Sequence, residues 1–146
     1  MVLSTLVGLL VGTSLFTFHV AKGTSYLSND PLACVNCHIM REPLDSWQKS
    51  SHHAVAVCND CHVSQHAVGK WVTKADNGFR HSWAFTFQDF HEPIQMHPRG
   101  SAVLQQNCLR CHAEFVQDVV RHAPLDDDAL NCVRCHASVG HGARHD

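Results

Sequence analysis

Cys34-Val35-Asn36-Cys37-His38-Ile39-Met40 is the stretch that decides the fold of this chain, because it holds the first of four Cys-x-x-Cys-His boxes. The other boxes span residues 58–62, 108–112 and 132–136. Two thiols three positions apart can add to the two vinyl groups of one haem, and the histidine that follows can ligate its iron. A single Cys-x-x-Cys could instead be half of a zinc ribbon or a redox dithiol. Four complete boxes use all eight cysteines, so the sequence predicts four covalent c-type haems (iron).

The predicted haem-binding residues are the box cysteines and the ligands beside them. The cysteines are Cys34, Cys37, Cys58, Cys61, Cys108, Cys111, Cys132 and Cys135, and His62, His112 and His136 close the last three boxes. In the first box, His38 and Met40 compete for one iron, because one short turn cannot present both to the same face. Methionine ligation would raise the potential of that haem. The alternative is that Met40 is only an apolar neighbour.

The composition favours a small haem-filled domain. Four porphyrins shared among about 120 residues would form much of the core, since so short a chain buries little surface by itself. The predicted fold is mostly α with extensive loops, in which an N-terminal transmembrane helix precedes a compact tetrahaem domain. Only 16% of the residues are charged, the formal net charge is −2, and no Lys/Arg cluster indicates nucleic acid as a partner.

The spacing of the boxes predicts the domain organisation. Boxes one and two begin 24 residues apart, as do boxes three and four, and 50 residues separate the middle two. This symmetry indicates two di-haem halves, at about residues 30–66 and 101–141, as a duplication would produce. The expected domains are residues 1–25 for the anchor and its exit, and residues 26–146 for the tetrahaem domain.

The N-terminal segment 2–20 contains no charged residue and is rich in Leu, Val, Gly and Phe. As a helix it would extend about 28 Å, enough for the hydrocarbon core of a bilayer. The competing interpretation is a cleaved secretory signal. The apolar run is longer than a usual signal core, and residues 18–22 do not form a small-x-small cleavage site, so we expect an uncleaved single-pass anchor. Because bacteria attach c-type haem outside the cytoplasm, we expect the boxes on the periplasmic side of the cytoplasmic membrane.

The segments between the boxes give further local predictions. Asp30 can cap, and Pro31 can begin, a short helix that leads into box one. Short helices are also expected over residues 42–51, 101–111 and 113–121, with a surface loop over 91–100 and a cap from the three aspartates at 126–128.

An aromatic and basic stretch occupies residues 66–90. It holds six of the eleven aromatic residues of the chain, interleaved with Lys70, Lys74, Arg80 and His81. Such a mixture is typical of the headgroup level of a lipid bilayer. The alternative is a plain haem-packing core, and the two interpretations are compatible.

The apolar anchor, the four boxes, the Cys-x-x-Cys-His-x-Met form of the first box, and Ser-His-His before the second together resemble the NapC/NrfH family of membrane-bound tetrahaem quinol dehydrogenases. More narrowly, the chain looks like the NrfH-type small subunit of cytochrome c nitrite reductase. The resemblance covers nearly the whole chain, and its specific part runs from residue 30 to residue 87.

The resemblance implies ligands and a substrate site. Haem 1 would take Met40 rather than His38. His53 would be the distal ligand of haem 3, and His141 that of haem 2. Haem 4 would keep His136 and receive a lysine from the catalytic partner, with His122 as an internal substitute. The family's quinol lysine matches Lys74, and His81 stands where some relatives have a carboxylate, so these two residues are the candidate catalytic groups. The alternative is that Lys74 is simply solvated and that His81 packs in the haem core.

The function that the resemblance implies is menaquinol oxidation, with electrons passing through haems 1 to 4 to a pentahaem nitrite reductase that converts nitrite to ammonium. The expected partners are therefore that catalytic subunit, menaquinol and the lipid bilayer, within a larger hetero-oligomer. Two alternatives remain: a tetrahaem wire with no substrate of its own, and a quinol dehydrogenase that serves another periplasmic reductase. The expected chemistry is proton acceptance beside a haem edge.

Overall fold

The computed structural model describes residues 1–122 and 131–142, and within these ranges it contains helices and loops but no strand. The prediction of a mostly α fold with extensive loops is confirmed. In chain order the elements are α1 (Val2–Val20), η1 (Gly23–Leu27), η2 (Pro31–Asn36), η3 (His38–Met40), α2 (Arg41–Gln48), α3 (Cys58–His62), α4 (Ala67–Phe87), α5 (Pro98–His122) and α6 (Cys132–Cys135). The three η elements are short 3-10 helices. The cap predicted at residues 126–128 lies outside the described ranges.

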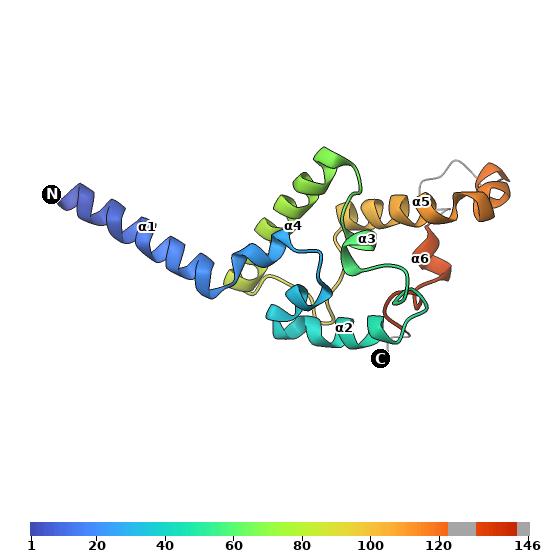
Figure 1. Ribbon diagram of the computed structural model, residues 1–146, viewed down its shortest axis with the longest axis horizontal. Coiled ribbons are helices and arrows are strands. Elements are labelled where there is room, and N and C mark those ends of the chain that lie inside the picture. Colours follow the sequence, from blue (N-terminus) through green and yellow to red (C-terminus); the bar gives the residue numbers. More distant parts are fainter. Residues whose placement is uncertain (123–130, 143–146) are drawn as a thin grey trace.

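Helix α1 stands apart from the rest of the molecule. It projects away from the other helices (Figure 1), and none of its residues is buried. Its 19 residues are long and apolar enough to cross a bilayer, a property that it shares with N-terminal signal sequences. Because every apolar side chain of α1 faces outward, this helix needs an apolar environment that the rest of the chain does not supply.

The entry to the first box follows its local sequence signals. Asp30 is the N-cap of η2, and its carboxylate accepts a hydrogen bond of 2.8 Å from the backbone N–H of Leu32. Pro31 occupies the first position of η2, where its missing N–H costs nothing. The predicted cap and helix start are therefore confirmed. The helix expected from residue 42 is present as α2.

Helix α4 contains most of the aromatic and basic stretch. Its C-terminal half returns to the foot of α1 (Figure 1), and Gly78 lies beside the ring of Tyr26 in η1. On one side of α4 the rings of Phe79, Trp83 and Phe87 follow one another at intervals of four residues, with centroid distances of 6.2 and 4.4 Å. We call these three residues the aromatic ladder. All three are exposed, at 68%, 50% and 62%.

Helix α5 packs against α3. The expected helices over residues 101–111 and 113–121 are one continuous helix, because neither glycine nor proline interrupts residues 101–122. Asn107 is buried on α5, and its amide donates hydrogen bonds of 2.9 Å to the carbonyls of Cys61 and Val63. This amide ties the end of box two to the turn of α5 that begins box three.

Candidate haem and quinol sites

The thiols of boxes one and two meet at the foot of the anchor. In the unmodified chain Cys58 is hydrogen-bonded to Cys34, which lowers the pKa of Cys34 to about 7 and raises the pKa of Cys58. Asn59, next to Cys58 on α3, adds a polar link, since its amide donates to Ser28 O at 3.0 Å and to Asn29 Oδ1 at 2.9 Å. The first two attachment sites are therefore neighbours, although 24 residues separate them in the sequence.

The attachment sites of boxes two, three and four are also neighbours in space. Desolvation raises the pKa of Cys108 to about 11, with smaller contributions from the nearby thiols of Cys132 and Cys61. The backbone N–H of Cys132 donates to Gln105 Oε1 at 2.9 Å, which fixes α6 against α5. The attachment sites therefore follow one another in space in the order 1, 2, 3 and 4.

His62 and His141 form a facing pair of imidazoles. Their ring centroids are 5.9 Å apart with an interplanar angle of 34°. Two metal–nitrogen bonds of roughly 2 Å on opposite sides of one iron would place two ring centres about 6 Å apart. His141 Nδ1 donates to the carbonyl of Pro43 at 3.0 Å, which leaves Nε2 as the free nitrogen. Desolvation lowers the pKa of His62 to about 4, so this imidazole is neutral at neutral pH, as ligation requires.

A second facing pair consists of His52 and His112. Their ring centroids are 6.1 Å apart, again the spacing that an iron between two imidazoles requires. His52 Nδ1 lies 3.2 Å from the carbonyl of Val139, an orientation that leaves Nε2 free. The sequence had indicated His53 for this place. The ring of His53 instead packs edge-on against Trp47 at 4.7 Å, and within the described part of the chain it has no hydrogen bond.

The reason for this one-residue difference is the turn before box two. Residues 50–56 form successive turns in which His53 N–H donates to Ser50 O, and the N–H groups of Val55 and Ala56 donate to His52 O. Neighbouring residues of such a turn point in different directions. The sequence identifies the Ser-His-His motif but does not distinguish its two histidines, whereas half-burial of His52 and exposure of His53 do.

The residues expected to ligate haems 1 and 4 do not face a second imidazole within the described part of the chain. His38 is exposed and Met40 is half-buried at the end of η3. His136 is exposed just after α6. The side chain of His122, the internal substitute considered for haem 4, lies outside the described part.

Lys74 and His81 lie on α4 beside the first box, at different depths. Lys74 is only 6% exposed, and its ammonium donates to Ser28 O at 2.9 Å and lies 3.5 Å from Asn29 Oδ1. Desolvation, together with the charge of Lys70, lowers the pKa of Lys74. His81 is more open, and its Nδ1 lies 2.6 Å from the hydroxyl of Tyr26. Tyr26 did not stand out in the sequence, although it is the only tyrosine and follows the anchor directly.

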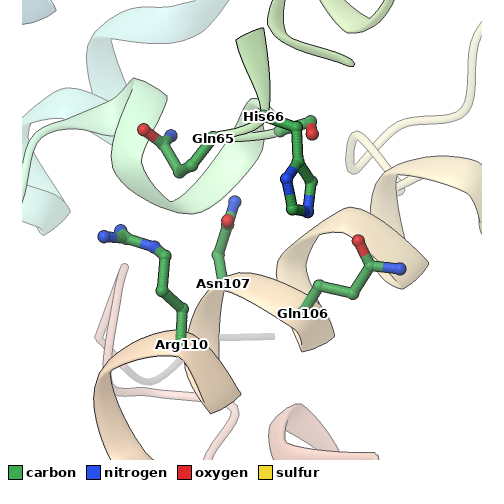
Figure 2. A pocket seen from close by; sticks show the side chains of 6 residues that line it. Gln65, His66, Gln106, Asn107 and Arg110 are labelled. Carbon is green, nitrogen blue, oxygen red and sulfur yellow. The ribbon is translucent and has the colours of Figure 1, made fainter. Parts of the chain in front are cut away.

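A separate cavity of about 340 Å³ lies between the segment after box two and α5. Its lining residues are Ser64, Gln65, His66, Gln106, Asn107 and Arg110. Figure 2 shows Gln65 and His66 opposite the three α5 side chains. All six lining residues are of polar or charged types, and neither Lys74 nor His81 is among them, so this cavity lacks the aliphatic and aromatic residues that usually line a site for an apolar ring.

The residues present fit haem rather than a bare metal ion. None of the eight cysteines is in a disulfide. Across residues 1–122 and 131–142, no three His, Cys, Asp or Glu side chains converge as ligands of one ion. Val63, at 4% exposed, is the one buried apolar residue of the described part, while Val72 and Phe115 are 61% and 84% exposed. Macrocycles between the helices would supply the apolar core that the side chains do not form.

Comparison with known proteins gives one family and two relatives. The family model described as the NapC/NirT cytochrome c family, N-terminal region, matches residues 1–145. The cytochrome c-type protein NrfH of Wolinella succinogenes is 37% identical over 126 residues, which are 84% of this chain and 71% of that protein. The crystal structure of the cytochrome c nitrite reductase NrfHA complex bound to the inhibitor HQNO is similar with a TM-score of 0.68 and 26% identity, over 99% of this chain and 92% of that one.

Proposed function

The chain belongs to the NapC/NirT family of c-type cytochromes, and we propose that it is the menaquinol-oxidising subunit of a cytochrome c nitrite reductase. It is a membrane-anchored electron-transfer protein with four covalently bound haems, as the sequence predicted. Its partner is the nitrite reductase catalytic subunit, called NrfA in the related complex. The oxidation of menaquinol and the orientation of the haem domain toward the periplasm are the finer parts of the proposal.

The observation that supports this function best is the spatial order of the attachment sites. The first box lies at the foot of α1. Cys34 is hydrogen-bonded to Cys58, Cys61 is close enough to Cys108 to raise its pKa, and Cys108 is hydrogen-bonded to Cys132. A haem, when bound, supplies an iron that accepts and releases one electron. Four attachment sites in this order provide a path from the membrane surface to a partner beyond box four.

We assign the ligands from the facing histidine pairs. His62 and His141 would hold haem 2, and His112 and His52 would hold haem 3, with His52 in place of the His53 that the sequence indicated. For both distal residues a backbone carbonyl accepts from Nδ1, which fixes the tautomer that ligates through Nε2. Met40 for haem 1, and His136 with a lysine of the partner for haem 4, remain predictions from the family resemblance.

The quinol site is proposed between the first box and the foot of α1, beside Lys74 and His81. An ammonium has three N–H donors, and Ser28 O and Asn29 Oδ1 take at most two of them. The remaining donor can bind a quinol oxygen and favour its anion, because the positive charge lies in a desolvated place. The imidazole of His81 can accept a proton near neutral pH. The aromatic ladder on the same helix suits the bilayer interface from which a quinol would enter.

The test is to extract the membranes with mild detergent and to assay the purified complex. We expect a nitrite reductase catalytic subunit to co-purify, and menadiol, a water-soluble naphthoquinol, to drive nitrite reduction. HQNO, which is bound in the structure of the related complex, should inhibit the menadiol reaction but not reduction by dithionite. Haems that dithionite reduces and menadiol does not would refute quinol oxidation and favour the wire. Co-purification of a different reductase would refute the assignment to nitrite reduction.

A further inference from the structure

The strongest unassigned feature is the contact between Tyr26 and His81, which joins η1 to α4 across 55 positions of the sequence. The tyrosine hydroxyl lies 2.6 Å from His81 Nδ1, and the two ring centroids are 6.0 Å apart. The tyrosine ring also lies beside Gly78, where an added Cβ would be 3.7 Å from the ring. A side chain at residue 78 larger than alanine would compete with the ring for this space.

We propose that Tyr26 is a positioning residue for quinol oxidation, whose hydroxyl oxygen accepts a hydrogen bond from His81 Nδ1 and so leaves Nε2 free to accept a proton from the quinol. The inference rests on the proposed function and deepens it. A histidine can serve as a base only in the tautomer whose outward nitrogen is unprotonated, and that tautomer is fixed by the partner of the other nitrogen.

The chemistry balances without a further reactant. In each of two steps an O–H bond of the quinol would break and Nε2 of His81 would take the proton. The first haem, when bound, would accept one electron and pass it on toward the second haem before the next step. His81 returns the proton to water between the steps. The quinol has then lost two protons and two electrons, and the product is the quinone.

The surroundings of the pair allow this role. Desolvation, with smaller effects from Cys37 and Cys34, raises the pKa of Tyr26 to about 12, so its hydroxyl stays neutral at working pH. Desolvation also lowers the pKa of His81, which keeps the imidazole in its proton-accepting form. The imidazole of His62 on α3 is also close enough to His81 for the charge of His81 to lower its pKa. The two cysteines become uncharged thioethers once haem is attached.

The experiment compares Tyr26→Phe with Thr24→Val in the purified haem-loaded complex. Both substitutions remove one hydroxyl from η1, but within the described residues the Thr24 side chain has no hydrogen-bond partner. Tyr26→Phe should lower kcat for menadiol about tenfold with little change in KM. The acid limb of the pH–rate profile of this variant should move to lower pH. The reason is that the protonated imidazole of His81 loses the tyrosine hydroxyl that accepts its hydrogen bond. Thr24→Val should match the parent in both. Haem content and reduction by dithionite should be equal in all proteins.

A double-mutant cycle with His81→Ala decides whether Tyr26 acts through the histidine. In the His81→Ala background, Tyr26→Phe should have no further effect on the rate. A tenfold loss in that background as well, or a Tyr26→Phe protein that matches the parent in rate and pH profile, would overturn the inference while leaving quinol oxidation intact. A parent complex that does not oxidise menadiol would instead overturn the proposed function, and the inference with it.

Discussion

Replacing His52 with alanine should remove one axial ligand from haem 3, whereas replacing His53 should not. The geometry gives the size of the effect. Among the described residues, His52 and His112 are the only pair of imidazoles that includes the histidine of box three, and their 6.1 Å spacing suits two ligands on one iron, so one of four haems should change from low-spin to high-spin. About a quarter of the low-spin haem signal should be lost.

The assay is absorption and electron paramagnetic resonance spectroscopy of the purified complex, read as the change from the parent because haem 4 depends on its partner. The reduced His52→Ala protein should also bind carbon monoxide at the opened position. His53→Ala is the matched control, since it removes the adjacent imidazole, which packs on Trp47. A high-spin haem in His53→Ala and an unchanged spectrum in His52→Ala would refute the assignment and restore the ligand indicated by the sequence.

Three further predictions test the attachment sites, the quinol site and the contact between the halves. Intact-mass analysis of denatured protein should show an excess of four haems, about 2.5 kDa, because thioether bonds survive unfolding; a mass equal to the bare chain would end the cytochrome assignment. Lys74→Ala should lower menadiol oxidation at least tenfold, about 1.4 kcal/mol in the barrier, whereas Lys70→Ala, one turn earlier on α4, should not. Asn107→Ala leaves the carbonyl of Cys61 without its amide donor, whereas Val63 O keeps Gln65 Nε2 at 2.8 Å, and should lower the free energy of unfolding by about 1–3 kcal/mol in denaturant titrations, with exposed Gln106→Ala near the parent value.

Features that depend on neighbouring residues could be predicted from the sequence. The Asp30 cap and the start of η2 are one example, because the capping oxygen and the N–H that it accepts from are two positions apart. The apolar α1 helix is another, since nineteen uncharged residues in a row leave few other folds. The four boxes belong to this class as well, because attachment chemistry requires the cysteines and the histidine within five positions.

Features that depend on contacts between residues far apart in the chain could not be predicted from the sequence. The choice between His52 and His53 is made by a turn and by Val139, which lies 87 positions away. The pairing of Tyr26 with His81 requires α4 to return to the foot of the anchor, which no local pattern indicates. The burial of Lys74 also depends on a distant contact, because Ser28 O, which accepts a hydrogen bond from its ammonium, is 46 positions away. The sequence identified the chemical types of these groups, but only the fold pairs them.

Under the proposed ligation, the segment after box four must be synthesised before two of the haem sites can be completed. Val139 accepts the hydrogen bond that orients His52, and His141 faces His62 while donating to Pro43 on α2. Under the proposed ligation, residues 139–141 follow the last box but would complete the sites of the two middle haems. Under the proposed ligation, haems 2 and 3 cannot acquire their final ligand geometry until the chain has been made beyond residue 141. The two di-haem halves indicated by the box spacing are then interdependent, because each supplies groups that complete a haem site in the other.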